Sequence, residues 1–271
     1  MTTDQTQTAD VVMLESYLRQ LNLKTFAAQH ADFAKEAATS QASYTRFLLA
    51  LAEQEVADRL TRRRERRLKE AKFPVRKQLD SFDFSLLPSL DEKKVAQLQE
   101  GHYIDETQSV ICIGAPGLGK THIATALGMA AAHQTRRVRF FNAAGLVNEL
   151  IAAQEAGKLQ LLLNRAVAHD LIILDELGFI PFTQKGAQLI FQFCSAVYER
   201  TSLIITTNLP FAHWTQLFGN EQLTVALLDR LTHRAHILEF VGDSYRFRQR
   251  LAQDVSIPQP DLLEKEGASN A

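Results

Sequence analysis

The stretch from Val110 to Thr121, VICIGAPGLGKT, constrains the fold of this chain more than any other part of it. Four apolar residues lead into the pattern Gly-x4-Gly-Lys-Thr, which is typical of a glycine-rich loop between a β-strand and a helix. The backbone N–H groups of such a loop, the positive end of the helix dipole and the lysine charge all suit a polyphosphate. The candidate nucleotide-binding residues are Gly114, Ala115, Pro116, Gly117, Leu118, Gly119, Lys120, Thr121 and His122.

The rest of the chain after Leu79 alternates between short apolar runs and helical patterns. The apolar runs are continuous, which indicates a parallel sheet that is buried on both faces. The sequence therefore predicts an α/β fold with a parallel five-stranded sheet. The expected strands are residues 110–113, 137–141, 171–174, 203–206 and 237–240, and the main expected helical stretches are residues 121–133, 144–168 and 184–200.

Two carboxylates and an amide follow strands of this sheet. Asp175 and Glu176 come directly after the apolar run LIIL, at the carboxyl end of a strand, where open α/β sheets bind ligands. Asp175 and the Thr121 hydroxyl are the expected ligands of Mg²⁺, and Glu176 is the expected base that takes a proton from the attacking water. Asn208 ends the fourth strand and is a candidate for holding that water, although Thr-Thr-Asn-Leu-Pro reads equally well as a turn. ATP and Mg²⁺ are the expected cofactors.

The N-terminal part of the chain predicts a small all-helical domain. After about ten polar residues, expected to be disordered, come two helical patterns, the second of which is long and ends near Pro74. Residues 59–77 contain ten basic and two acidic residues in a chain whose net charge is only −1. Such a run is often a solvated helix face, but its arginine density favours contact with DNA phosphates. The candidate contacts, at helical spacing, are Arg59, Arg62, Arg63, Arg66 and Arg67.

Composition excludes several classes of protein. The chain has 271 residues, of which 46% are hydrophobic, so it is large enough for a packed core. No apolar run approaches the roughly 18 residues of a membrane helix, so we expect no membrane partner. The two cysteines, Cys112 and Cys194, have neither metal nor disulfide spacing and suit a reducing compartment. The sequence thus favours a cytoplasmic protein.

Two further segments, residues 146–169 and the aromatic pair Phe82 and Phe84, each allow a functional and a purely structural interpretation. Residues 146–169 form a long excursion between the second and third strands, and long insertions in α/β units often carry function. Lys158 in this excursion and Lys185 in the loop after the third strand are candidate DNA contacts. The alternative is that the helices of the excursion only cover the sheet. Phe82 and Phe84, just before the nucleotide-binding core, are either a wall for the adenine or ordinary core aromatics.

With these motifs in order, the chain from about Leu79 to Arg250 resembles an AAA+ ATPase. The loop is its Walker A motif, the strand that ends in Asp175 and Glu176 is its Walker B motif, and Asn208 is similar to its first sensor. Four further segments are similar to IstB, the ATP-binding transposition helper of insertion sequences. They are GFIPFTQKGAQLIFQF, TTNLPFAHW, LTVALLDRLTHRAHILEF and GDSYRFRQ. The helical start resembles that family too, and the core is more distantly similar to the helicase loader DnaC.

The resemblance implies domains and two further site residues. It implies a helical N-terminal domain over residues 1–78, an AAA+ core over residues 79–252 and a disordered tail over residues 253–271. Arg230 would be an arginine finger that acts on the ATP of a neighbouring subunit, and Arg246 the second sensor. Neither arginine has a sequence-local partner. The usual C-terminal lid domain of AAA+ proteins is missing or reduced to residues after Phe240.

The function that the resemblance implies is an ATP-dependent DNA-binding helper of transposition. It would assemble on duplex DNA into a ring or helical oligomer and recruit an integrase-type transposase encoded nearby. The alternative is a replicative helicase loader, but the N-terminal domains of loaders often carry a zinc site, and residues 1–78 contain no cysteine. A metabolite kinase is disfavoured because a kinase must exclude water, whereas Glu176 suits the activation of water. A DNA-bending protein with an inactive nucleotide site is disfavoured because every catalytic position is filled.

Overall fold

The computed structural model describes residues 2–179, 181–242, 244 and 245. The chain divides into two compact units, Met1–Lys69 and Glu70–Ala271. The proposed tail over residues 253–271 and the candidate sensor Arg246 lie outside the described residues. In the part of the chain that the structure describes, no helix combines the length and the apolar character needed to cross a membrane.

The N-terminal unit contains the helices α1 (Thr2–Gln20) and α2 (Lys24–Thr39) and most of α3 (Tyr44–Ala71). The expectation of ten disordered residues is wrong, because α1 begins at Thr2. Polar contacts join α2 to α3: the Thr25 N–H donates to Glu55 (2.7 Å) and the Thr25 hydroxyl to Asp58 (2.8 Å). Burial alone would raise the pKa of Glu55, but hydrogen bonds from Arg59 and Thr25 outweigh it and hold the pKa below its ordinary value.

The second unit opens with short elements that lead to the sheet. They are the 3₁₀ turns η1 (Leu79–Ser81) and η2 (Phe84–Leu86) and the helices α4 (Glu92–Gln99) and α5 (His102–Asp105). Asp91 caps α4 by accepting from the N–H groups of Lys93 and Lys94, as acidic residues commonly do at helix starts. Pro74 lies just beyond the end of α3, as the sequence predicts.

The sheet has five strands, all parallel, as the sequence predicts. They are β1 (Ser109–Gly114), β2 (Val138–Asn142), β3 (Leu171–Asp175), β4 (Ser202–Thr207) and β5 (Ala235–Phe240). Their order across the sheet is β2-β3-β4-β1-β5. β4 therefore lies between β1, which leads into the glycine-rich loop, and β3, which ends at Asp175.

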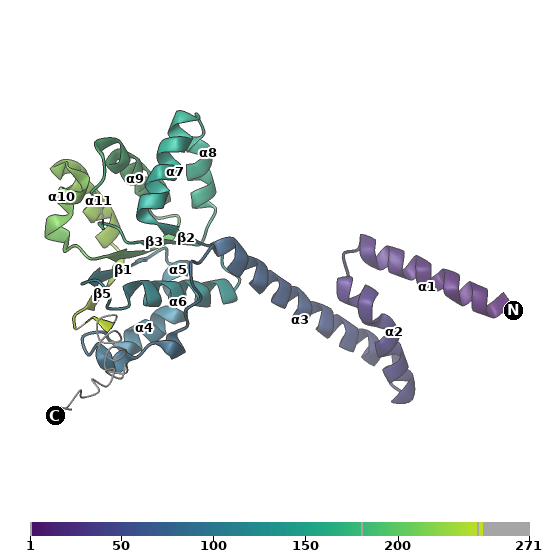
Figure 1. The fold of residues 1–271 in the computed structure, drawn as a ribbon. Coiled ribbons are helices and arrows are strands. Elements are labelled where there is room, and N and C mark those ends of the chain that lie inside the picture. Colours follow the sequence, from purple (N-terminus) through teal and green to yellow (C-terminus); the bar gives the residue numbers. More distant parts are fainter. Residues whose placement is uncertain (1, 180, 243, 246–271) are drawn as a thin grey trace, which may run out of the picture. The chain divides into compact units, whose positions relative to one another are not determined.

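Helices cover both faces of this sheet (Figure 1). The first helix after the loop, α6 (Lys120–His133), lies on one face together with α4. The helices on the other face are α7 (Ala143–Glu155), α8 (Leu159–Val167), α9 (Gln184–Val197), α10 (Trp214–Phe218) and α11 (Glu221–Thr232), with the turn η3 (Phe211–His213) before α10. Burial on both faces explains the continuous apolar runs of β1, β3 and β4, whereas the edge strands β2 and β5 also contain charged residues such as Arg139 and Glu239.

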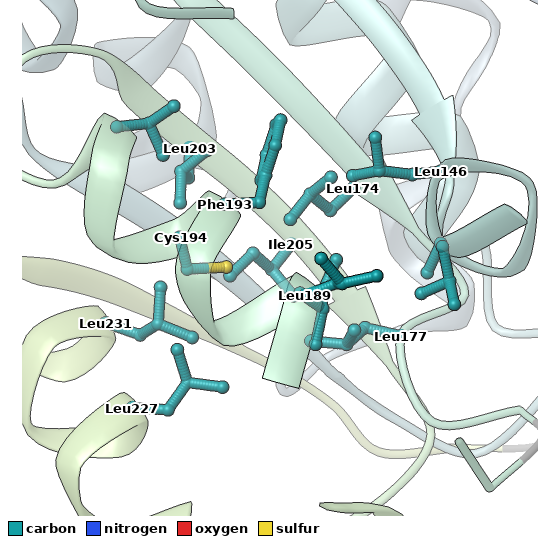
Figure 2. Close-up of a cluster of buried hydrophobic side chains, with 14 of the residues drawn as sticks. Leu146, Leu174, Leu177, Leu189, Phe193, Cys194, Leu203, Ile205, Leu227 and Leu231 are labelled. Atoms are coloured by element: carbon teal, nitrogen blue, oxygen red, sulfur yellow. The ribbon is translucent and has the colours of Figure 1, made fainter. Parts of the chain in front are cut away.

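The main core cluster lies between the sheet and the helices α7, α9 and α11 (Figure 2). Phe193 and Cys194 of α9 pack there against Leu174 of β3 and Ile205 of β4, and all four side chains are buried. Cys112 of β1 is buried as well, and burial raises the pKa of both thiols to about 12. Both cysteines are therefore neutral core residues at physiological pH.

Candidate active site

The glycine-rich loop lies between the last residue of β1 and the first turn of α6. Gly117 and Gly119 have φ angles of 84° and 87°, in the left-handed region that glycine adopts without strain. Gly119 directly precedes α6, so the N-terminus of this helix faces the loop. Lys120 Nζ donates to the carbonyl oxygens of Gly114 (2.8 Å) and Ala115 (2.7 Å). The ammonium group of Lys120 therefore lies against the backbone at the start of the loop.

A hydrogen-bond network joins this loop to the ends of β3 and β4. The hydroxyls of Thr121 (2.9 Å) and Thr206 (2.7 Å) both donate to Asp175 Oδ1. The Thr206 hydroxyl also accepts from the backbone N–H of Glu176 (2.8 Å). The structure thus brings together Thr121, Asp175 and Glu176 from segments far apart in the sequence. Thr206 is an additional member that the sequence did not indicate.

The Thr121 hydroxyl and the Asp175 carboxylate fit a magnesium ion that also binds phosphate. Both are hard oxygen ligands, and Mg²⁺ in nucleotide sites commonly uses one or two such protein groups beside substrate phosphates. Among the described residues there is no group of three or more His, Cys, Asp or Glu side chains that could hold a metal ion. Two oxygen donors leave coordination positions for phosphate oxygens and water, so this donor set favours a site shared with a nucleotide.

Glu176 stands in an unusual backbone conformation at the end of β3. Its φ is 61°, in the left-handed region, which costs a non-glycine residue free energy and is common at functional sites. Its carboxylate is exposed, and Oε2 accepts from the Asn142 side-chain amide (2.9 Å). Asn142 ends β2, where it also accepts from the Gly145 N–H to cap α7. Asn142 is a second site residue that sequence reasoning missed.

The aromatic segment before the sheet contacts the start of α6. The ring centroids of Phe82 and His122 are 5.2 Å apart, and those of Phe82 and Phe84 are 4.9 Å apart. His122 Nε2 is 2.9 Å from the carbonyl oxygen of Gln78. Phe82 also lies so close to Gly119 that a Cβ there would be 2.6 Å from its ring. These contacts are consistent with a wall beside the loop, as one of the two interpretations of Phe82 and Phe84 expects.

The position of β4 places Asn208 near the same edge of the sheet. Asn208 directly follows β4, which lies between β1 and β3, and it is half-buried. The carboxyl ends of parallel strands lie at one edge of the sheet. Because β4 lies between β1 and β3, Asn208 lies between the loop after β1 and Asp175 at the end of β3. Its proposed contact with the attacking water stays a prediction.

Arg230 is distant from the glycine-rich loop of its own chain. It lies near the end of α11, which leads into β5 at Ala235, and Ala235 pairs with Ser109, the first residue of β1. The loop follows Gly114 at the opposite end of that strand. The expectation that Arg230 has no local partner is wrong: its guanidinium donates to the Ala226 carbonyl (3.1 Å) and lies over the ring of Phe191, 5.0 Å from its centroid.

The arginine stripe on α3 is not uniform. Arg59 Nε is 2.6 Å and Arg62 Nη2 is 3.3 Å from the buried Glu55 carboxylate, so both guanidinium groups are held within the helical unit. Arg59 also donates to the Asn22 carbonyl (2.8 Å). Arg63 and Arg66 are exposed and Arg67 is half-buried. The ion pairs with Glu55 therefore give Arg59 and Arg62 a structural role within the helical unit.

The two candidate lysines of the core have different surroundings. Lys185, near the start of α9, forms an ion pair with Glu155 at the end of α7 (2.8 Å). Lys158, the residue before α8, lines a surface groove between α7, α8 and β2. An exposed ion pair contributes little to stability, so Lys185 is not committed to Glu155. DNA contact by either lysine stays a prediction.

Replacement of Asp175 by asparagine is expected to stabilise the nucleotide-free protein. Burial raises the pKa of Asp175, against the opposing effect of hydrogen bonds from Thr206 and Thr121, so its ionised form costs free energy at neutral pH. Because the folded-state pKa is raised, this carboxyl stabilises the fold at low pH and loses that contribution as the pH rises through its pKa. An asparagine still accepts from both hydroxyls and carries no charge.

Thermal unfolding of Asp175→Asn at pH 7 without nucleotide should therefore have a midpoint a few degrees above that of the wild type. The difference should shrink as the pH is lowered into the range where Asp175 is protonated in the folded protein. Asp229→Asn, which removes an exposed carboxylate of α11, is the control. A midpoint for Asp175→Asn below that of the wild type at pH 7 would contradict this account of the site.

Comparison with known proteins adds to this geometry. Residues 16–253 match the family model described as IstB-like ATP binding protein. A protein of Geobacillus stearothermophilus, named for insertion sequence IS5376 and for ATP binding, is 34% identical over 89% of this chain and 96% of its own length. A Pseudomonas aeruginosa protein, named for insertion sequence IS21 and for ATP binding, is 35% identical over 88% of this chain and 89% of its own.

One solved structure indicates the fold. The crystal structure of DnaI superposes with a TM-score of 0.50 and 16% sequence identity, over 61% of this chain and 92% of that chain. At this level of identity, the likeness concerns the arrangement of the sheet and its helices and not the function.

Proposed function

Because the chain belongs to the IstB-like family of ATP-binding proteins and has the AAA+ P-loop fold, we propose that it is an ATP hydrolase that helps a transposase use target DNA. The observation that carries the proposal is the network from Thr121 through Asp175 and Thr206 to Glu176, beside the phosphate loop. It joins groups suited to bind a phosphate, a divalent cation and a water molecule. The protein would act in the cytoplasm.

The hydrolysis step assigns a task to each of these groups. Lys120 and the N–H groups of the loop bind the β- and γ-phosphates, and Thr121 and Asp175 hold Mg²⁺, which when bound neutralises phosphate charge. Glu176 orients a water molecule and accepts its proton, and Asn208 holds that water from the side of β4. Asn142 keeps the Glu176 carboxylate in place through its amide. Arg246 is proposed to contact the phosphates as a second sensor.

The position of Arg230 supports the proposed assembly. It lies toward the end of the sheet opposite to its own phosphate loop, so its guanidinium is available to the loop of a neighbouring copy rather than to its own. A contact of this head-to-tail kind generates a ring or an open helix. ATP bound at such an interface would stabilise the assembly, and hydrolysis would weaken it.

DNA binding is assigned to the arginine stripe of α3. Arg63, Arg66 and Arg67 recur at three- and four-residue spacing, so they share a face that can follow a phosphate backbone. Arg59 and Arg62 are included in the stripe, although both guanidinium groups also pair with Glu55. Lys158 and Lys185 remain a second proposed contact. The helicase-loader alternative gains nothing specific from the structure, because the DnaI likeness concerns the fold alone.

The double variant Arg63→Ala/Arg67→Ala is expected to weaken DNA binding to a similar extent on duplexes of different sequence, because phosphate contacts do not read bases. If four to six basic residues release counterions, the wild-type slope of log affinity against log salt concentration is about −4 to −5 per subunit. The variant should lower the magnitude of that slope by about 2. Fluorescence anisotropy with a labelled duplex, over a salt series in ATP and Mg²⁺, measures it.

The matched control removes two positive charges elsewhere in the same helical unit, in Lys24→Ala/Lys35→Ala on α2. It should leave the salt slope within experimental error of the wild type. A slope for Arg63→Ala/Arg67→Ala that equals that of this control would rule out phosphate contact by the stripe.

A further inference from the structure

A groove with apolar walls lies on the edge of the second unit, away from the phosphate loop. It has a volume of about 540 Å³ and is formed by the edge strand β2 and the helices α7 and α8. Its apolar lining includes Phe141 of β2, Ala152 and Ala153 of α7, and Leu161 and Leu162 of α8. Leu161 is 49% exposed, although it is a large apolar side chain. The volume is within the range of about 300–1,000 Å³ that is usual for ligand pockets.

The charged side chains that line this groove are mostly basic. Arg139, Lys158 and Arg165 carry positive charge there, against the single carboxylate of Glu149. The Arg139 guanidinium is held in place, because it lies 5.0 Å from the centroid of the Phe141 ring and donates to the Glu70 carbonyl (3.4 Å). The groove therefore combines an apolar floor with fixed positive charge.

We propose that this α7–α8 groove binds an acidic segment of a partner protein, with a bulky apolar side chain on the floor and carboxylates beside the basic residues. The inference rests on the proposed function, under which the partner is the transposase. Peptide segments commonly bind in this way, with apolar anchors in a groove and charges that fix their position. Arg139 and Arg165 can each pair with a carboxylate through two N–H groups.

The apolar lining favours a protein segment over DNA. A DNA backbone presents charged, strongly hydrated phosphates, which gain from Lys158 and Arg165 but not from Leu161 or Leu162. An apolar anchor gains roughly 25 cal/mol for each Å² that it removes from water. Lys158 is part of this groove, so its proposed contact with DNA and a contact with the partner protein compete for the same side chain.

The test compares the full-length protein and its variants in binding to the purified transposase on duplex DNA with ATP. Leu161→Ala removes the exposed side chain of the floor without removing charge, and Arg165→Glu reverses the charge beside it. Both should weaken transposase binding at least tenfold, with DNA affinity and ATP hydrolysis within twofold of the wild type. Lys93→Glu, an exposed lysine of α4 on the opposite face of the sheet, is the charge-matched control for Arg165→Glu and should bind the transposase normally.

A photo-crosslinking residue in place of Leu161 identifies the occupant directly. A crosslink to an acidic segment of the transposase supports the proposal, whereas a crosslink to DNA, or to another copy of this chain, overturns it. Normal transposase binding by Leu161→Ala and Arg165→Glu overturns it as well. If the wild type does not bind the transposase, both the proposed function and this inference are wrong. If the wild type binds it and the groove variants bind it equally tightly, only the assignment of the groove is wrong.

Discussion

The Glu176→Gln variant is expected to bind ATP about as tightly as the wild type and to hydrolyse it at least about 100-fold more slowly. The amide occupies the same space as the carboxylate but cannot accept a proton from water, so the loss falls on the chemical step. Lys120→Ala should instead lose nucleotide binding, because the substitution removes the ammonium group that lies against the loop carbonyls of Gly114 and Ala115. Single-turnover hydrolysis and binding of a fluorescent ATP analogue measure the two effects separately.

Glu199→Gln is a matched control for Glu176→Gln. Glu199 is also an exposed glutamate in the left-handed backbone region, with a φ of 56°, but it follows α9 and does not belong to the network around Asp175. Its substitution should leave hydrolysis unchanged. Wild-type turnover in Glu176→Gln would remove Glu176 from the mechanism.

The Arg230→Ala variant is expected to lose at least about 100-fold in hydrolysis, since an arginine that contacts the transferred phosphoryl group is typically worth 10³–10⁵ in rate. Mixed with an equal amount of Lys120→Ala, it should recover activity. An Arg230→Ala subunit still has an intact loop, and a Lys120→Ala neighbour still has an intact arginine. If the two variants mix at random, roughly a quarter of the head-to-tail interfaces combine an intact loop with an intact arginine. The mixture should therefore reach at most roughly a quarter of the wild-type rate, and less if Lys120→Ala, which is not expected to assemble by itself in ATP, enters mixed assemblies less readily.

This complementation also separates catalysis from packing. Arg230 lies over Phe191 and donates to Ala226, so the packing of α11 is a competing explanation for a loss of activity in Arg230→Ala. A subunit with a damaged fold would not regain activity from a neighbour. If mixed assemblies form and remain as inactive as either variant alone, the assignment of Arg230 to the neighbouring subunit is wrong.

The sequence predicts most of the second unit because its signals are local. The pattern Gly-x4-Gly-Lys-Thr fixes a strand, a turn and a helix within a dozen or so residues, and the continuous apolar runs predict buried parallel strands. The order of strands depends instead on long crossovers. That β4 lies between β1 and β3 follows from packing between distant segments, and no short pattern records it.

The candidate site shows the same division. Lys120, Thr121, Asp175 and Glu176 belong to motifs and were predicted. Asn142 and Thr206 reach the site because β2 and β4 flank β3. Thr206 opens the segment Thr-Thr-Asn-Leu-Pro, but its hydrogen bond to Asp175 joins strands distant in sequence, which no local pattern predicts. The α7–α8 groove could not be predicted from the sequence for the same reason, since three separate elements form its walls.

A local signal was available for the arginine stripe. Glu55 precedes Arg59 by four residues, the spacing at which opposite charges meet on a helix, so this pair was predictable from the sequence. The burial of Glu55 was not, because it depends on α2 packing against α3 through Thr25. The partner of Arg230 was likewise partly local, since Ala226 is four residues earlier on the same helix.

The central claim, that ATP hydrolysis controls assembly on DNA, is tested most directly by the lifetime of the protein on duplex DNA after rapid dilution in ATP and Mg²⁺. Fluorescence anisotropy of a labelled duplex follows it for the wild type, Glu176→Gln and Lys120→Ala. The account predicts that the wild type dissociates as it consumes ATP, that Glu176→Gln stays bound at least tenfold longer, and that Lys120→Ala does not form the ATP-dependent assembly. Equal lifetimes for the wild type and Glu176→Gln, or DNA assembly by Lys120→Ala as stable as that of the wild type in ATP, would contradict it.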